Sequence, residues 1–330
     1  MNASRWSSAL EEFDVRCETS SATGTIYSRI RMHIFTFGRN SAFCAFERAA
    51  LVEEGYAMKT DAHAQDDDSY EVPKIIWLYW EGKLNREVRY LLHNLKEKVK
   101  DFTLIFITDS TLHFYMERDE IEYKMKNLPS ANKADYYRLK TLYDYGGIWM
   151  DATIYVCNET FLEESYREIT EAKAELFAFN SWWHPAYHIE MGFLIAPKRS
   201  PIVGKAFEEF KYMLSVGGKR YIKDRIKEGI VLKSPAIYVP ATDTKRERIR
   251  TYLASYVCMQ TVVQRDYKGK PNAILKRSED TYYKLYESCK WEAKCVADRW
   301  GNDPEVQQYP LVKFFSGTRG KVKFPEVDVI

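Results

Sequence analysis

The sequence lacks the long apolar runs of an integral membrane protein. Its longest uninterrupted run is the six residues Ile75–Trp80, far short of the roughly 18 that a membrane span requires. The N-terminal stretch MNASRWSSALEEFD has no basic region followed by an apolar one, so a secretory signal is not expected. We therefore expect a cytoplasmic protein, with peripheral contact to a membrane left open.

Cysteine usage is ordinary, but the spacing of the cysteines lacks the patterns of the common cysteine-built sites. The six cysteines form no C-x-x-C pair and no zinc-like pattern. Cys289 and Cys295 are the closest pair along the chain. Because a cytoplasmic chain keeps its thiols reduced, we expect free cysteines, with a disulfide between these two as the minor alternative.

No internal repeat and no glycine-rich phosphate loop is present. After the first strand of the predicted sheet the chain reads EGKLN at positions 81–85, with a single glycine, which argues against a nucleotidyltransferase. Hydrophobic residues make up 45% and charged residues 29% of the 330 positions, enough for a sizeable core. The length suits one large α/β domain with an appendage.

An excess of one charge is also lacking, since the net charge is only +2, but the charges are unevenly placed. Residues 211–330 hold 24 Lys and Arg against 14 Asp and Glu. A basic final third suits an anionic partner such as a nucleoside diphosphate, an acidic glycan or a lipid headgroup, and a merely solvated surface is the alternative. Nucleic acid is not expected, because no basic cluster is interleaved with stacking aromatics. The sequence predicts no oligomeric state.

Residues 1–70 read differently from the rest and form an N-terminal extension of unknown role. Alternating polarity predicts a strand over 26–37. A helix is expected over 41–54, ended by Gly55, and the acidic stretch 61–71 is interpreted as a linker.

From residue 74 the pattern becomes α/β. Apolar runs at 74–80 and 102–108 predict buried strands, and Asn85 is expected to cap the helix between them. A further helical stretch is expected from Asp109 or Ser110. Alternating strands and helices predict parallel pairing, and ligands of such sheets bind beyond the carboxyl ends of the strands.

The segment 130–156 carries the strongest functional pattern. It predicts a helix from an N-cap at Ser130 to about Tyr145, a stop at Gly146 or Gly147, and a strand that ends near Asp151. Two pairs are expected to point toward one sheet edge because of their spacing, namely Asp135 with Arg138 on the helix and Asp151 with Thr153 on the strand. A surface ion pair is the alternative for Asp135 and Arg138.

Three motifs, in order, resemble the capsular-polysaccharide-synthesis type of glycosyltransferase, which is related to glycosyltransferase family 32 and more distantly to the large clostridial glucosylating toxins. The first is IIWLYWEG at 75–82, and the second is ADYYR at 134–138 followed by GGIWMDAT at 146–153. The third is a strand at 191–197 followed by Pro201 and Ile202. The resemblance covers residues 72–156 and 190–203.

The resemblance implies a GT-A fold for residues 71–330, an α/β domain with a mixed, mainly parallel sheet flanked by helices. It also implies a retaining glycosyltransferase with a nucleoside-diphosphate sugar donor such as a UDP-sugar, a glycan acceptor, and a divalent metal, Mn²⁺ or Mg²⁺. Carried over by position, the implied catalytic and donor-binding residues are Trp80, Asp135, Arg138, Gly147, Asp151 and Thr153. Asp151 would bind the metal, and Thr153 stands where many relatives have a second aspartate.

That departure matters because a hydroxyl is a weaker metal ligand than a carboxylate. Thr153 would then bind the metal weakly or through water, or contact the ribose instead. A metal-free enzyme and a glycan- or nucleotide-binding pseudoenzyme are the alternatives. Trp80 would stack on the base, with a core role as its alternative.

Near the C-terminus, KFFS at 313–316 loosely resembles the family's basic stretch beside the diphosphate, which makes Lys313 a donor-binding candidate with a surface lysine as its alternative. His184 and His188 are interpreted as packed or hydrogen-bonded side chains, with a place in the acceptor cleft or a role as metal ligands as the alternatives. Glu190 is considered as a nucleophile for double displacement, but the resemblance implies same-face displacement without one.

Overall fold

The computed structural model describes residues 70–108, 110–117, 128–181, 188–230 and 253–327, together with the backbone of three strands within 11–46. Within these ranges no helix is both long and apolar enough to cross a bilayer.

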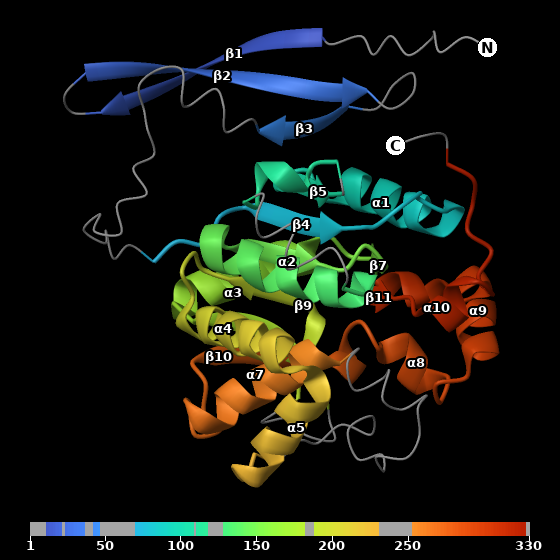
Figure 1. Cartoon of the computed structure of the whole chain (residues 1–330). Helices are drawn as coiled ribbons and strands as arrows, with labels where there is room; N and C mark the ends of the chain where they lie inside the picture. Colours follow the sequence, from blue (N-terminus) through green and yellow to red (C-terminus); the bar gives the residue numbers. More distant parts are fainter. Residues whose placement is uncertain are drawn as a thin grey trace, which may run out of the picture.

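The centre of the molecule is a six-stranded sheet with the strand order β10-β8-β9-β6-β4-β5 (Figure 1). Only β9 runs antiparallel to its two neighbours, whereas the other three pairings are parallel. The strands are β4 (Ile75–Tyr79), β5 (Thr103–Ile107), β6 (Gly147–Met150), β8 (Leu176–Asn180), β9 (Ile189–Ala196) and β10 (Ala273–Arg277). This mixed, mainly parallel sheet confirms the predicted fold class.

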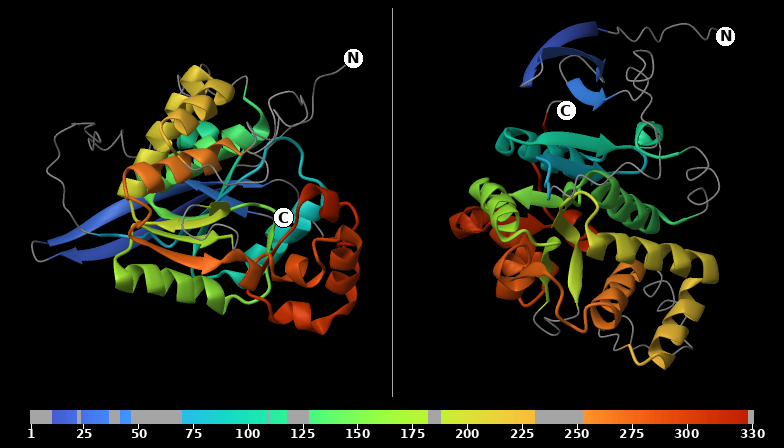
Figure 2. Two further views of the ribbon diagram at one scale, coloured as in Figure 1. Left: turned by 90° about the horizontal axis from the view of Figure 1, so that it is seen from below. Right: turned by 90° about the vertical axis from the view of Figure 1, so that its left-hand side faces the viewer.

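Helices cover both faces of the sheet, as the two views of Figure 2 show. One layer comprises α2 (Ser130–Tyr145), α4 (Pro201–Val216), α5 (Gly218–Lys227) and α7 (Ala254–Arg265). The opposite layer comprises α1 (Arg86–Lys98) and α3 (Thr160–Ala172). A 3₁₀ turn, η2 (Leu112–Phe114), stands where a helix was expected from Asp109 or Ser110. As predicted, the Asn85 side chain caps α1 by accepting from the Val88 amide at 2.9 Å.

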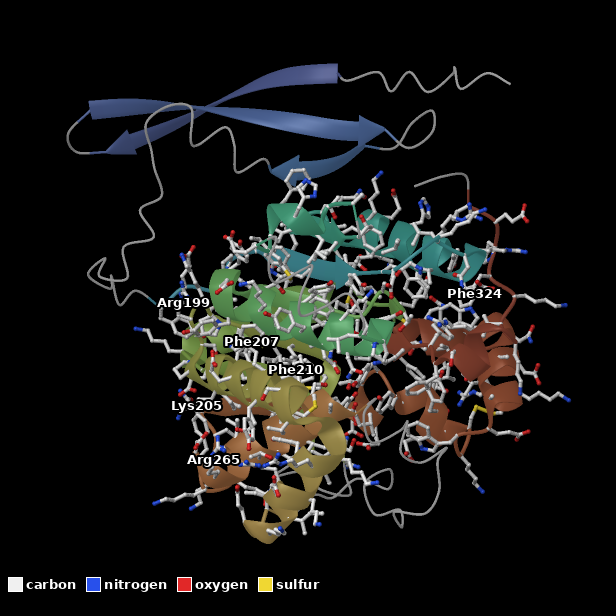
Figure 3. All side chains as sticks on the ribbon, viewed as in Figure 1. Arg199, Lys205, Phe207, Phe210, Arg265 and Phe324 are labelled. Carbon is white, nitrogen blue, oxygen red and sulfur yellow. A yellow bond between two sulfur atoms is a disulfide. The ribbon has the colours of Figure 1, made fainter. Side chains whose placement is uncertain are left out.

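Strand β4 shows why the apolar run at 74–80 is continuous rather than alternating. Ile76 and Leu78 pack in the core beneath α1 and α3, whereas Trp77 and Tyr79 pack on the α2 and α4 side. The α4 layer is closed by side chains such as Phe210, labelled in Figure 3, which is fully buried. A strand with water on neither face cannot carry a polar side, so both of its faces are apolar.

The N-terminal strands form a separate antiparallel sheet in the order β1-β2-β3, blue in Figure 1. They are β1 (Glu11–Ser21), β2 (Gly24–Thr36) and β3 (Ala42–Phe46). The strand expected over 26–37 is confirmed by β2. The helix expected over 41–54 is wrong for residues 42–46, because β2 offers an edge with which this segment pairs. The rest of that helix and the linker up to residue 69 lie outside the described residues.

The C-terminal part contains α8 (Lys284–Ser288), α9 (Ala293–Asn302) and α10 (Ser316–Arg319), and a two-stranded ribbon of β7 (Ile154–Val156) with β11 (Leu311–Lys313). Cys289 and Cys295 form a disulfide here, the yellow bond in Figure 3, which corrects the expectation of free thiols at these positions. The turn between α8 and α9 brings their Cα atoms to 5.6 Å, within the range that a disulfide requires. Cys157 and Cys258 are free and buried.

Candidate active site

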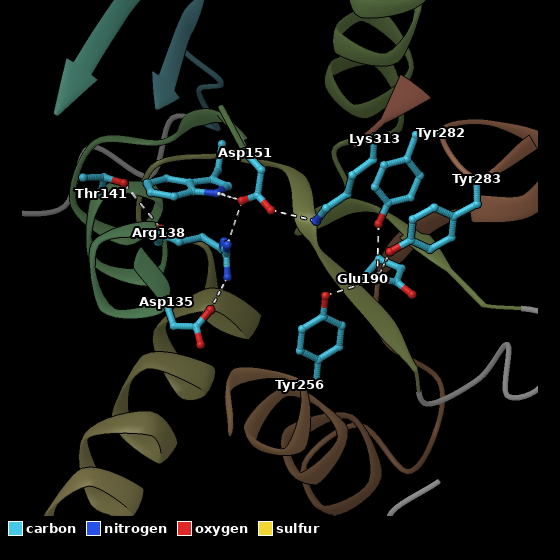
Figure 4. A network of polar contacts seen from close by, with 10 residues as sticks. Asp135, Arg138, Thr141, Asp151, Glu190, Tyr256, Tyr282, Tyr283 and Lys313 are labelled. Carbon is cyan, nitrogen blue, oxygen red and sulfur yellow. Dashed lines mark hydrogen bonds and ion pairs between the residues drawn. The ribbon is translucent and has the colours of Figure 1, made fainter. Parts of the chain in front are cut away.

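Helix α2 and strand β6 bring together the three residues on which the sequence interpretation depends. Asp135 and Arg138 are buried on α2, and Asp151 follows β6 directly. Nη1 of Arg138 donates to Asp135, and Nη2 of Arg138 donates to Oδ1 of Asp151 at 2.9 Å (Figure 4). The predicted convergence of these three side chains is therefore present, and the surface ion pair is not.

Two glycines make the tight turn from α2 into β6. Gly146 ends the helix at φ +72°, and its amide donates to Leu142. Gly147 has φ +98°, and a Cβ atom there would lie 2.7 Å from the Ile75 carbonyl oxygen. Gly147 does not line the cavity described below, although it was predicted to bind the donor. Its place in the fold explains the glycine instead, because only glycine adopts this backbone so close to β4.

Lys313 reaches the same point from the other end of the chain. Strand β11 pairs antiparallel with β7 so that Lys313 lies opposite Ile154, three residues after Asp151. Its Nζ donates to Oδ2 of Asp151 at 2.7 Å. Gly192 on β9 leaves the space for this ion pair, since a Cβ atom there would collide with Nζ and lie 3.1 Å from Asp151 Oδ2. The sequence analysis did not identify Gly192.

The surrounding charges hold Asp151 ionised. Burial raises the pKa of Asp151, but the positive charges of Lys313 and Arg138, with hydrogen bonds from Lys313 and Trp149, outweigh burial and bring it to about 2. The Trp149 indole donates to Oδ1 at 3.0 Å, and its ring also lies 5.1 Å from the Arg138 guanidinium carbon. Asp135 differs, because burial outweighs its contact with Arg138 and raises its pKa to about 6.

These side chains face a cavity of about 610 Å³ beyond the carboxyl ends of the parallel strands. Of the residues predicted to bind the donor, all but Gly147 line it, namely Trp80, Asp135, Arg138, Asp151, Thr153 and Lys313. Trp80 is partly exposed there and lies 5.6 Å from the guanidinium carbon of Arg319. Trp77 is buried in the core, with its indole donating to the Gly146 carbonyl at 2.8 Å.

A further carboxylate, the buried Glu190 on β9, also lines the cavity (Figure 4). Its Oε2 accepts from three tyrosine hydroxyls, those of Tyr256 at 3.2 Å, Tyr282 at 3.2 Å and Tyr283 at 3.1 Å. Its Oε1 accepts from Ser181 at 2.7 Å and lies 3.3 Å from His188 Nε2. The sequence analysis missed this network, and the adjacent tyrosines of the motif TYYK at 281–284 were its only visible signal.

The packed role expected for His188 agrees with its burial and with its 3.2 Å contact to Gln260. His184 lies outside the described residues. Burial and then the charge of Glu190 raise the pKa of Tyr283 well above its ordinary value, so its hydroxyl stays a donor. Glu190 itself has a pKa of about 2, because hydrogen bonds and the charge of His188 outweigh its burial.

The donor set does not fit a metal site built by the protein alone. Both oxygens of Asp151 already bind donors, namely Arg138 and Trp149 at Oδ1 and Lys313 at Oδ2. Among the described residues no three His, Cys, Asp or Glu side chains gather as metal ligands. A cation at Asp151 would have to displace the Lys313 ammonium, which already supplies positive charge at this position.

Residues 47–208 match the family of capsular polysaccharide synthesis proteins. The matched range contains Asp135, Arg138, Asp151 and Glu190 but ends before Lys313. A comparison with curated proteins finds no significant match.

Solved structures of glycosyltransferases are distantly similar. The PaToxG glycosyltransferase is 14% identical over 58% of this chain and 78% of its own, with a TM-score of 0.31. The glycosyltransferase GlyE of Streptococcus pneumoniae TIGR4 is 9% identical over 74% of this chain, with a TM-score of 0.31. Its apo form is 11% identical with a TM-score of 0.34. The chain covers 55% of the GlyE chain in both of these structures.

Proposed function

We propose that this protein is a retaining glycosyltransferase that moves a sugar from a nucleoside-diphosphate sugar, such as a UDP-sugar, to a hydroxyl group of a glycan. One observation carries the proposal. Two cations, Arg138 and Lys313, converge on Asp151 in a cavity that is also lined by Asp135 and Trp80. The match to capsular polysaccharide synthesis proteins supports the same reading.

Each of these residues has a chemical role that suits its environment. Trp80 stacks on the base, and the Asp135 carboxylate accepts from hydroxyls of the donor sugar. Arg138 contacts the oxygen that links sugar and phosphate. The Lys313 ammonium shifts from Oδ2 of Asp151 toward the departing diphosphate and neutralises its charge. A cation that is already positioned in a partly buried site stabilises such a charge effectively.

The reaction breaks the bond between the anomeric carbon and the diphosphate oxygen and forms a bond from that carbon to the acceptor oxygen on the same face. The acceptor proton passes to the leaving phosphate oxygen. Asp151 keeps the two cations in place until the anionic donor arrives. Mn²⁺ or Mg²⁺ stays a prediction from the resemblance, and no step above depends on it.

The test is nucleoside diphosphate release from a panel of sugar nucleotides, measured with and without EDTA and with added manganese. We expect UDP release from at least one UDP-sugar. Release that persists in EDTA would assign the charge neutralisation to Lys313 and Arg138. Absence of release from every donor under both conditions would overturn the enzyme assignment.

A pseudoenzyme that binds nucleotide or glycan without transfer is the second candidate. It is favoured by the full pairing of Asp151 and by Thr153 in the place of a second carboxylate. Calorimetry that shows UDP binding, in a protein that releases UDP from no donor, would support this candidate against the first.

A further inference from the structure

A seven-residue loop closed by a disulfide forms part of the cavity wall. It runs from Cys289, after α8, to Cys295 in α9, and presents Trp291. Lys290 and Trp291 have φ angles of +49° and +63°. The Trp291 amide donates to the Tyr286 carbonyl at 2.8 Å, and the Lys290 amide donates to the Glu287 carbonyl at 3.0 Å.

Two consecutive left-handed residues that are not glycine are unusual, because each costs about 1–2 kcal/mol. Such a conformation persists only where the surrounding structure imposes it, and it concentrates at functional sites. The disulfide and the two amide hydrogen bonds impose it here. The backbone of Trp291 is therefore held in one fixed conformation.

The indole of Trp291 is oriented as firmly as its backbone. Its Nε1 donates to Glu287 Oε1 at 2.7 Å, and the ring packs against Tyr283 and Phe315 at centroid distances of 5.3 and 6.2 Å. Trp291 nevertheless remains 42% exposed, and it lines the same cavity as Asp151 and Lys313. The cavity wall thus carries a rigid aromatic surface that the fold does not bury.

We propose that Trp291 is the platform of the acceptor subsite, on which a pyranose ring of the acceptor glycan stacks. The proposal rests on the glycosyltransferase function above and names its second substrate site. The carbon-bound hydrogens on one face of a sugar ring are weakly positive, and they pack well on the electron-rich face of an indole. A ring held in place before binding loses little entropy when it stacks, which favours affinity.

Trp291 and Trp80 both line the cavity but have different neighbours. Trp80, at the end of β4, is the aromatic predicted for the base and lies beside Arg319. Trp291 adjoins Tyr283, whose hydroxyl binds Glu190, so it lies on the side of the hydroxyl-rich network. Sugar hydroxyls need hydrogen-bonding partners beside an apolar face, and Tyr256 and Tyr283 of this network line the same cavity as Trp291.

The experiment compares glycan binding of the full chain and its Trp291→Ala variant on an array of immobilised oligosaccharides. We expect the wild-type protein to bind at least one glycan class and the variant to bind it about tenfold more weakly. Trp291→Phe should keep part of the affinity. Tyr212→Ala is the matched control, because Tyr212 is an aromatic of similar exposure, 41%, outside this cavity, and it should bind as the wild type does.

Removal of the disulfide provides a second experiment. The double variant Cys289→Ser with Cys295→Ser, checked for folding by its thermal unfolding, should bind glycans less tightly than the wild type, because Trp291 is released. Binding equal to the wild type in this variant would overturn the role of the disulfide.

UDP affinity, measured by calorimetry, separates donor from acceptor. Trp80→Ala should weaken UDP binding, whereas Trp291→Ala should leave it unchanged. Weaker UDP binding in Trp291→Ala, or a wild-type protein that binds no glycan on the array, would overturn the proposal. Glycan binding needs no turnover, so a wild-type protein that binds glycans but releases no UDP would sink the enzyme proposal alone.

Discussion

Asp151 and Glu190 are two of the carboxylates that line the cavity, and their partners are of opposite kinds. Asp151 is paired with two full cations, Arg138 and Lys313. Glu190 is surrounded by neutral hydroxyl groups and His188. Both carboxylates have a pKa of about 2. The pKa of Asp151 is lowered by the opposite charges of Lys313 and Arg138, and that of Glu190 mainly by hydrogen bonds and by His188.

Because their partners differ, Asp151 can exchange its partners for a ligand, whereas Glu190 cannot. The cations around Asp151 attract any incoming diphosphate, so this cluster can exchange a protein carboxylate for a ligand phosphate. The tyrosines around Glu190 are weak partners for an anionic ligand, and each would lose its buried acceptor if Glu190 moved. We infer that Asp151 belongs to the chemistry and that Glu190 holds the cavity wall.

Replacement of Asp151 by Asn should have the largest effect. The amide keeps the shape but cannot balance two cations, so UDP release should fall by about 10³-fold or more. Far-UV circular dichroism should show an unchanged fold. Wild-type turnover in Asp151→Asn would remove Asp151 from the mechanism.

Lys313→Met should come next, because it removes the cation proposed to neutralise the leaving group while keeping the length of the side chain. We expect kcat to fall by about 10²-fold. Lys313→Arg is the matched control and should retain much of the rate. Equal losses in Met and Arg variants would point to packing rather than charge.

The pH dependence of kcat/KM should report Asp135. Its pKa is raised to about 6, so below that pH the carboxyl is protonated and no longer accepts from a sugar hydroxyl. We expect kcat/KM to fall about tenfold per pH unit below pH 6. Asp151 and Glu190, with pKa values of about 2, do not titrate in this window. An inflection that persists in Asp135→Asn would assign it to another group.

Glu190→Gln should have the smallest effect on rate. The amide disturbs the hydroxyl network and should lower the free energy of unfolding by about 1–3 kcal/mol, measured by urea denaturation. The change in kcat should stay within about threefold, since a group that does not touch the reacting atoms contributes little to the barrier. A loss as large as that of Asp151→Asn would make Glu190 a nucleophile and erase the contrast between the two carboxylates.

Local patterns predicted the elements around the site well. The end of α2, the glycine stop and the position of Asp151 after β6 agree with the sequence pattern, because periodicity and helix stops act within a few residues. The N-cap predicted at Ser130 is wrong, because Ser130 is the first helical residue and Pro129 occupies the cap position. The helix expected over 41–54 failed over 42–46, because strand pairing with β2 overrides a weak local preference. Gly147 was predicted to bind the donor because it belongs to the motif. A motif gives a residue's position in the sequence but not the direction in which its backbone faces.

The sequence by itself determined the alternation of strands and helices and the pairing of Asp135 with Arg138, three residues apart on one helix. Only the tertiary structure decided that Lys313 meets Asp151, 162 residues away, and that Tyr282 and Tyr283 meet Glu190. The disulfide that orients Trp291 belongs with these, because it depends on a turn geometry that spacing does not reveal. Local structure depends on interactions between residues that are close in the sequence. Contacts between distant segments depend instead on how β11 and α8 pack against the folded sheet.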